Sequence, residues 1–189
     1  MTDPWARFAG TGARQDGEAR EVTPRPASAS RTEISSVMQI TDANNDGNVH
    51  GGSIMRLVDE AAGIAAMRHA RRRVVTASMD DMSFLAPVFI GDLVTVRAMV
   101  NDAHRTSMEV GVRVDVENIA TEEWRYVASA HLVLVALDQE GRPSEVPAVV
   151  AGSAEERRRQ EQARVRREHR LVRKRALAQA AATKDRDTP

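Results

Sequence analysis

The segment from Ser53 to Ala70 constrains the fold most strongly, because its spacing is helical and apolar residues occupy most of its faces. A surface helix has one apolar stripe, whereas a helix that is apolar nearly all round must be covered by other elements. The acidic pair Asp59 and Glu60 interrupts the pattern about two turns into the helix. The chain therefore needs a layer of structure that wraps around this segment, whose apolar positions include Ile54, Leu57, Val58, Ala61, Ile64 and Ala65.

The rest of the central sequence predicts β-strands. The clearest is Met108–Glu117, where apolar and polar residues alternate, which predicts one buried and one exposed face. Four further strands are expected, over residues 31–41, 74–84, 93–101 and 124–137. One buried helix followed by a run of antiparallel strands indicates an α+β fold and excludes a doubly wound α/β fold. Because such a sheet has open edges, we expect two copies to pair their edges in a dimer.

The composition divides the chain into four parts. Residues 1–30 mix Gly, Pro, Ser and charged residues without a period, so we expect them to be disordered. Residues 31–150 are expected to form one domain, which is the usual number for a chain of 189 residues. Residues 151–180 predict a charged helix with a thin apolar stripe, and residues 181–189 a disordered tail.

The formal net charge of zero conceals an uneven distribution of charge. Residues 31–150 carry 11 basic and 17 acidic side chains, whereas residues 151–189 carry 12 basic and six acidic ones. We therefore expect the C-terminal helix to dock on the acidic body of the domain or on a neighbouring subunit. Nucleic acid is a disfavoured partner, because the basic segment has no aromatic residue on which a base could stack.

The absence of certain residues and segments excludes several classes of protein. The chain has no cysteine, which removes disulfides, thiolate metal sites and cysteine nucleophiles. No apolar run approaches the ~18 residues of a membrane-spanning helix. Because the first ten residues lack the apolar run of a signal peptide, we expect a cytoplasmic protein.

The stretch before the predicted helix contains a partial calcium-binding motif. Asp42, Asn44, Asp46 and Gly47 match the start of an EF-hand loop. That loop requires a bidentate glutamate at its twelfth position, which is Ser53 in this chain. We therefore interpret the stretch as a tight turn, and we expect no metal site.

The start of the predicted helix carries the residues best suited to catalysis. Gly51 and Gly52 leave backbone N–H groups free at the positive end of the helix, where a carbonyl group or oxyanion could bind. Asp59 is costly in an apolar helix unless it is paired or borders a wet cleft, where it could act as a general base. Each polar residue also has a structural interpretation. In it, Asp59 lies on an exposed stripe of the helix, Asn44 is a residue of the turn, and His50 is a residue at the start of the helix.

The run from Asn44 to Gly63 resembles the hotdog-fold acyl-CoA thioesterases, specifically the brain-type cytosolic acyl-CoA hydrolases and their single-domain bacterial relatives. The similarity extends from about Arg31 to Arg175 and implies a hotdog fold, in which an antiparallel sheet wraps a long central helix. This implication agrees with the pattern of helix and strands. The matching blocks are Gly47-Asn48-Val49-His50-Gly51-Gly52, Val58-Asp59-Glu60-Ala61-Ala62-Gly63, Val75-Thr76-Ala77-Ser78-Met79-Asp80, Ser107-Met108-Glu109-Val110 and Gln139-Glu140-Gly141-Arg142-Pro143.

The resemblance implies hydrolysis of fatty acyl-CoA at a site that spans a dimer interface. Asn44 of one subunit would face Asp59 of the other, with Asp59 activating a water molecule or attacking directly, and Asn44 positioning the water or the thioester. The N–H groups of Gly51 and Gly52 would stabilise the oxyanion, and His50 ranks behind these residues. The reaction needs no cofactor, because coenzyme A is part of the substrate.

The phosphates of coenzyme A require basic partners. Arg105 is the first candidate and Arg142 the second, because guanidinium groups suit bidentate phosphate contacts. Ser107, two positions after Arg105, is the third residue that we expect to bind coenzyme A. The alternative for both arginines is a surface charge in a loop. The resemblance also implies a homodimer, and a hexamer built as a trimer of dimers.

Two other functions within the same fold are weaker. A non-catalytic acyl-CoA-binding protein could lack the catalytic pair, but both Asn44 and Asp59 are present. A hotdog dehydratase would use His50 with a helix acid, but the Pro-rich stretch around the histidine of those enzymes is absent.

Overall fold

The computed structural model describes residues 22–184, and its main elements follow the predicted order. The predicted sequence of one strand, a buried helix, four strands and a charged helix is confirmed by β2, α1, β3–β6 and α2. The elements are β1 (Arg25–Pro26), the 3-10 helix η2 (Ala27–Ser30), β2 (Thr32–Val37), the 3-10 helix η3 (Ile40–Asp42), α1 (Gly51–Ala70), β3 (Arg73–Phe84), β4 (Leu93–Ala103), β5 (Ser107–Asn118), β6 (Glu123–Leu137), β7 (Val149–Val150) and α2 (Ala154–Lys184).

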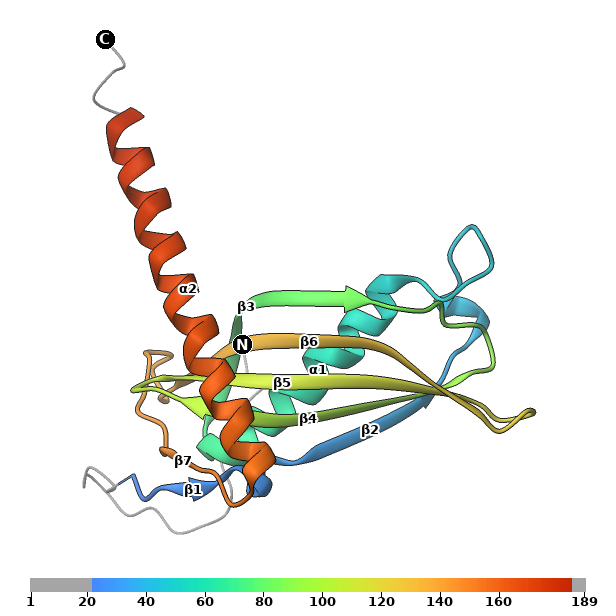
Figure 1. The fold of residues 1–189 in the computed structure, drawn as a ribbon, viewed down its shortest axis with the longest axis horizontal. Helices are drawn as coiled ribbons and strands as arrows, with labels where there is room; N and C mark the ends of the chain where they lie inside the picture. The colour runs from blue at the N-terminus through green and yellow to red at the C-terminus, as the bar shows by residue number, and fades with distance from the viewer. Residues whose placement is uncertain (1–21, 185–189) are drawn as a thin grey trace.

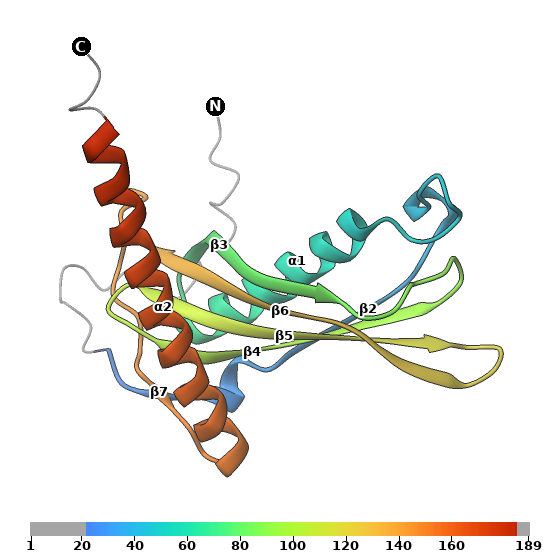
Figure 2. The same ribbon diagram turned by 45° about the horizontal axis from the view of Figure 1, so that its top comes forward.

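Five strands form an antiparallel sheet in the order β2-β4-β5-β6-β3. The long helix α1 lies against one face of this sheet, and α2 crosses the opposite face at one end (Figure 1, Figure 2). We refer to the face that carries α2 as the outer face. This is the α+β architecture that the sequence predicts for a hotdog fold.

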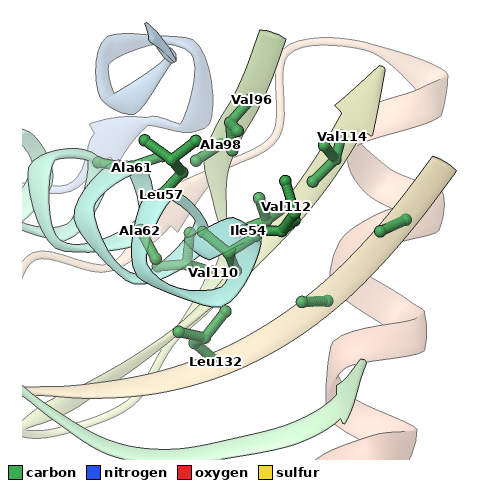
Figure 3. Close-up of a cluster of buried hydrophobic side chains, with 14 of the residues drawn as sticks. Ile54, Leu57, Ala61, Ala62, Val96, Ala98, Val110, Val112, Val114 and Leu132 are labelled. Atoms are coloured by element: carbon green, nitrogen blue, oxygen red, sulfur yellow. The ribbon is translucent and has the colours of Figure 1, made fainter. Parts of the chain in front are cut away.

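The core lies between α1 and the inner face of the sheet. Figure 3 shows Ile54 and Leu57 of α1 among aliphatic side chains of β4, β5 and β6. Burial of each large aliphatic side chain contributes roughly 1.5–3 kcal/mol to stability. The strand residues labelled in that view are Val96, Ala98, Val110, Val112, Val114 and Leu132, and all of them are buried.

The outward side of β5 is more buried than its alternating pattern predicts. Glu109 and Asp115 are both buried, although their side chains lie on the polar side of the strand. Arginines cover them: Arg166 of α2 contacts Glu109, and Arg113 contacts Asp115. Paired arginines satisfy these carboxylates, which would otherwise be costly to bury.

Helix α2 binds the outer face mainly through charged and polar side chains. Ser153 Oγ accepts the N–H of Glu156 at 3.1 Å, which caps the start of the helix. Farther along, Arg166 Nη2 lies 2.6 Å from Glu109 Oε1, and Gln160 Nε2 donates to Asp102 Oδ1 at 3.0 Å. The expected docking of the basic helix on the acidic body is therefore confirmed within a single chain.

Strand β3 forms one edge of the sheet and is the most exposed of the long strands. None of its residues is buried, whereas most residues of β4 and β5 are. Its ladder with β6 shifts register between Thr76 and Ser78, and again between Met79 and Asp81. One long side of β3 has no neighbouring strand within residues 22–184, so it could pair with another chain.

Two of the disorder predictions need correction. Residues 22–30 include the strand β1 and the helix η2, with Ala27 and Ser30 buried. The ladder of β1 with β7 and a hydrogen bond from Val100 N–H to Ser30 Oγ hold this segment in place. Helix α2 also continues to Lys184, because residues 176–184 are rich in Ala and contain no Gly or Pro. The predictions for residues 1–21 and 185–189 lie outside the described residues.

Candidate active site

The loop before α1 is organised by the side chain of Asn44. Its Oδ1 accepts the N–H groups of Asp46 at 2.9 Å and of Asn48 at 3.1 Å. Gly47 completes the turn with a φ of 81°, a conformation that favours glycine. The predicted tight turn is confirmed. Within residues 22–184 the Nδ2 group of Asn44 makes no hydrogen bond and could donate to a ligand.

His50 caps the start of α1. Its Nδ1 accepts the N–H of Gly52 at 2.9 Å, and its carbonyl oxygen accepts the N–H of Ser53 at 2.9 Å. This is the helix-end role that the sequence offers as one alternative for His50. The Gly52 N–H is therefore occupied, whereas the Gly51 N–H makes no hydrogen bond to any described residue. Of the two donors expected for an oxyanion, Gly51 is the one that remains available.

A cavity of about 410 Å³ lies beside the start of α1. The Phe84 ring closes against the helix, since a side chain placed on Gly51 would meet it at 3.5 Å. A cavity with both apolar and polar lining groups, next to a free N–H and a positive helix end, suits an apolar chain that ends in a carbonyl group. The lining residues are Asn44, Asn48, Val49, Gly51, Ile54, Phe84, Leu85, Ala86, Pro87 and Val88.

An ion pair between the buried Asp92 and the partly exposed Arg125 holds one wall of this cavity. Asp92 Oδ2 accepts the N–H of Phe89 at 2.9 Å and Nη2 of Arg125 at 2.9 Å. The Arg125 guanidinium also lies 5.3 Å from the centre of the Phe89 ring. These contacts attach the segment between β3 and β4 to the sheet. Residues that do not line the cavity thus hold the wall that this segment forms.

Asp59 lies on the exposed stripe of α1, as the structural alternative for this residue predicts. Its Oδ1 accepts the hydroxyl of Thr76, on β3, at 2.7 Å. The neighbouring Glu60 instead pairs with Arg56 on the same helix, at 2.7 Å. Asp59 is thus oriented by one short hydrogen bond to the edge strand, and its second oxygen accepts no hydrogen bond from any described residue.

Thr76 is the functional candidate that the residue-by-residue analysis did not single out. A threonine within a strand carries no periodic signal of a site, and its partner lies 17 residues away on another element. The one available signal is its position in the matching block from Val75 to Asp80.

The residues expected to bind coenzyme A gather at the opposite end of the sheet. Arg105 lies in the turn between β4 and β5, and Ser107 begins β5. The 138–147 loop lies beside this turn, since the Val146 N–H donates to the Arg105 carbonyl at 3.1 Å. Arg142 pairs with Asp138 at 3.1 Å and with a second acidic residue of the loop, whereas the exposed Arg105 makes no ion pair within residues 22–184.

In one chain these groups lie apart. Asn44 and Gly51 share the cavity, but Asp59 lies about 12 Å farther along α1, at 1.5 Å per residue. The Arg105 turn lies close to the C-terminal end of α1, which has 20 residues and is therefore about 30 Å long. Within one chain, therefore, Asp59 does not line the cavity that Asn44 and Gly51 share.

Residues 22–184 contain neither a metal-binding cluster nor a helix that could span a membrane. No group of three or more His, Asp or Glu side chains is arranged to hold a metal ion. No helix in the same range is long and apolar enough to cross a membrane.

Comparison with known proteins relates the chain to thioesterases. Residues 46–123 match the model of the thioesterase superfamily. The chain is 41% identical to the uncharacterized acyl-CoA thioester hydrolase YkhA of Bacillus subtilis, over 75% of this chain and 84% of that protein. It is 35% identical to the cytosolic acyl coenzyme A thioester hydrolase of Mus musculus over 76% of this chain, but spans only 38% of the mouse protein.

Solved structures extend this relationship to the fold. An apo-hexameric acyl-CoA thioesterase superimposes with a TM-score of 0.78 at 37% identity, covering 80% of this chain and 97% of its own. The acyl-CoA hydrolase of Staphylococcus aureus, in complex with butyryl coenzyme A, coenzyme A and coenzyme A disulfide, superimposes with a TM-score of 0.77 at 34% identity, covering 85% and 98%. Sequence and fold together show that this chain belongs to the hotdog-fold acyl-CoA thioesterases of the thioesterase superfamily.

Proposed function

We propose that the protein hydrolyses fatty acyl-CoA to a free fatty acid and coenzyme A, in a site to which two copies of the chain contribute. The observation that carries the proposal is the hydrogen bond from Thr76 to Asp59, next to the unpaired edge of β3. An exposed carboxylate held by a single donor, beside a surface that a second chain can cover, is poised to act on a ligand at that interface.

Pairing of two β3 strands would assemble the site. A two-fold axis through the middle of β3 makes the two strands antiparallel, so the start of one lies beside the end of the other. Thr76 and Asp59 lie near the start of β3, while Phe84, at its end, borders the cavity with Asn44 and Gly51. Asp59 of one copy would therefore approach the cavity of the other.

The spacing of the candidate residues supports this assignment. Solved structures of the Staphylococcus aureus hydrolase include three alanine variants, at an asparagine, an aspartate and a threonine. Those three positions are separated by 15 and 17 residues, as are Asn44, Asp59 and Thr76 in this chain. The choice of these positions for substitution fits a role of Asn44, Asp59 and Thr76 in the reaction.

In the proposed reaction Asp59 takes a proton from water, and the resulting hydroxide attacks the thioester carbonyl. Asn44 of the other copy positions the water or the thioester through its free Nδ2 group. The Gly51 N–H and the positive end of α1 stabilise the oxyanion. The carbon–sulfur bond then breaks, and the coenzyme A thiolate accepts a proton. Direct attack by Asp59, through a mixed anhydride that water cleaves, uses the same groups.

Coenzyme A would extend from this site toward the Arg105 turn. Antiparallel pairing brings that end of one chain close to the cavity end of the other, so Arg105 and Asp59 would come from the same copy. Arg105 is the better phosphate partner, because Arg142 already pairs with Asp138 and Glu140. We further propose that three such dimers form a hexamer, as in the hexameric acyl-CoA thioesterase that superimposes on this chain. A cytoplasmic location agrees with the name of the cytosolic mouse relative.

Release of free thiol from acyl-CoA tests the function. The purified chain is given butyryl-, octanoyl- and palmitoyl-CoA with a thiol reagent, which cannot react with the protein because the chain has no cysteine. We expect hydrolysis, and a fall of about 10²- to 10⁴-fold in kcat for D59N, since a general base contributes that much.

The matched control is E60Q, which changes the adjacent exposed acid of α1 and should leave kcat unchanged. Acyl-CoA binding by calorimetry without turnover of any of the three substrates would instead identify a non-catalytic binding protein.

A further inference from the structure

The middle of β3, residues 77–81, is irregular, and we call it the bulged stretch. In a regular strand Thr76 and Asp80 would point to the same face, because side chains alternate with a period of two. The ladder of β3 with β6 shifts register twice here, and β-bulges of this kind re-aim side chains. Thr76 reaches Asp59 of α1 on the inner face of the sheet. Asp80 instead reaches the outer face, where it forms an ion pair with Arg170 of α2.

The Arg170 guanidinium bridges two strands that are not neighbours in the sheet. Its Nη1 binds Asp80 Oδ2 of β3 and lies 3.3 Å from Glu109 Oε2 of β5, and β6 runs between these strands. Glu109 is buried and also binds Arg166, one turn earlier on α2, at 2.6 Å. Ser78 Oγ donates to the other carboxylate oxygen of Asp80 at 3.3 Å. Helix α2 is therefore attached to the edge strand at the bulged stretch and to the centre of the sheet at the same time.

The ion pair of Asp80 with Arg170 is largely shielded from water. The two side chains are 15% and 26% exposed, whereas those of Glu155 and Arg158, an ion pair within α2, are 49% and 58% exposed. An exposed pair contributes little to stability, but loss of one partner from a shielded pair leaves an uncompensated charge. The pair also holds a strand that has a neighbouring strand on one side only within residues 22–184. Removal of Arg170 should therefore loosen the bulged stretch.

We propose that Arg170 is a positioning residue for thioester hydrolysis. It holds the bulged stretch of β3 in place and thereby keeps Thr76 within hydrogen-bond reach of Asp59. The inference rests on the proposed function, in which Asp59 is the reacting carboxylate. Arg170 lies on the outer face and Asp59 on α1 at the inner face, so Arg170 acts through β3 and not on the substrate. The effect on the rate can be large, because a displacement of about 1 Å can cost about 10²-fold.

The test is a cycle of two variants, R170Q and T76V, in the thiol-release assay. We expect R170Q to lower kcat roughly 5- to 10-fold with KM nearly unchanged, since the hydrogen bond that it weakens acts on the reacting group. In a T76V background R170Q should have almost no further effect, because that hydrogen bond is already absent. R170K keeps a positive charge near Asp80 and should recover part of the activity. The matched control is R173Q, which changes an exposed arginine of the same helix and should leave kcat unchanged.

Two results of this cycle would overturn the inference. One is an equal kcat for R170Q and the unaltered chain. The other is the same fold-loss from R170Q with and without the Thr76 hydroxyl, which would show that Arg170 does not act through Thr76. Both results leave the proposed function in place, because the unaltered chain still hydrolyses the thioester.

Amide hydrogen exchange tests the same contact without turnover. Exchange at residues 77–81 should be faster in R170Q than in the unaltered chain, and unchanged in R173Q. Unchanged exchange in R170Q would overturn the inference whatever the activity. Faster exchange in R170Q, together with no thiol release by the unaltered chain, would reject the proposed function and retain the control of β3 by Arg170.

Discussion

At the scale of single residues, the hydroxyl of Thr76 is the described group that orients the carboxylate of Asp59. The neighbouring Glu60 has a similar exposure but pairs with Arg56 along its own helix, so it is not directed toward the edge strand. Two adjacent acids on one helix thus have different partners, and the proposed catalytic role falls to Asp59. The same comparison explains why Glu60 serves as the control for Asp59.

The first prediction concerns this hydrogen bond. T76V preserves the shape of the side chain and removes its hydroxyl, which leaves Asp59 without its donor. A hydrogen bond to a charged group is worth about 1.5–3 kcal/mol, so kcat should fall roughly 10- to 100-fold. T76S, which restores the hydroxyl, should recover most of the activity. Equal activity of T76V and the unaltered chain in the thiol-release assay would show that the hydrogen bond has no part in the reaction.

At the scale of the elements, the start of α1 combines a structural cap with the N–H group proposed to bind the oxyanion. His50 caps the helix by accepting the Gly52 N–H. Of the two glycine N–H groups expected to bind the oxyanion, only that of Gly51 is therefore available. The cap also limits substitution, since a side chain on Gly52 would meet His50 Nδ1 at 3.0 Å. This close approach accounts for a glycine at position 52.

The second prediction separates the capping role of His50 from acid–base chemistry. H50N keeps a side chain that can accept the Gly52 N–H, whereas H50A removes the cap and should cost about 1 kcal/mol of unfolding free energy. If His50 acts as a cap, H50N retains near-normal kcat and its stability. A loss of more than about 10²-fold in kcat for H50N with unchanged stability would assign His50 to proton transfer instead.

The long periodic elements could be predicted from the sequence, and the non-local contacts could not. Apolar spacing predicted α1, and alternation predicted β5, because each pattern repeats over many residues. The two-residue strands β1 and β7 are too short to carry a period, so residues 22–30 were wrongly expected to be disordered. The bond between Thr76 and Asp59 joins two elements, and no local pattern encodes it.

For helix α2, the charge distribution predicts where the helix docks but not which residues it buries. The excess of acidic side chains in residues 31–150 predicted that the basic helix docks on the domain, and the contact of Arg166 with Glu109 confirms it. The alternation of β5 nevertheless placed Glu109 on an exposed face. Whether an outward residue is buried depends on which element crosses it, and α2 is distant from β5 in the sequence.

At the scale of the whole molecule, three histidines link stability to pH. Burial is the main cause that lowers the pKa of His69, whose Nε2 lies 2.9 Å from the Pro147 carbonyl oxygen. Burial likewise lowers the pKa of His104 and His131, and neighbouring arginines of α2 lower both further, Arg167 for His104 and Arg166 for His131. The folded protein therefore resists protonation of all three rings.

The third prediction follows from the sign of these shifts. An unfolded histidine binds a proton near pH 6.5, while the folded rings do so only at lower pH, so the unfolded state binds more protons as the pH falls below about 6.5. Stability should be constant above that value and decrease below it. Urea unfolding at pH 7.5 and 5.5, at fixed ionic strength and protein concentration, should show a lower midpoint at pH 5.5.

Two acidic residues with lowered pKa values stay charged across this pH window. The pKa of Asp138 is lowered by the backbone N–H of Arg142, and that of Glu155 is lowered to about 2 by Arg158 and Arg159, so both stay charged at pH 5.5. The variant H69Q, which removes the most buried ring, should show a smaller difference between the two pH values. An equal or higher midpoint at pH 5.5 for the unaltered chain would contradict the assignment.

The most direct measurement of the central claim, a catalytic site shared by two chains, is complementation between two inactive variants. N44A and D59N are co-expressed with different tags, and the thiol release of the mixed population is compared with that of each variant alone. In a heterodimer one site carries both substitutions and the other carries neither, so random assembly should restore about a quarter of the unaltered activity. Purified assemblies that carry both tags and are no more active than either variant alone would contradict the shared site.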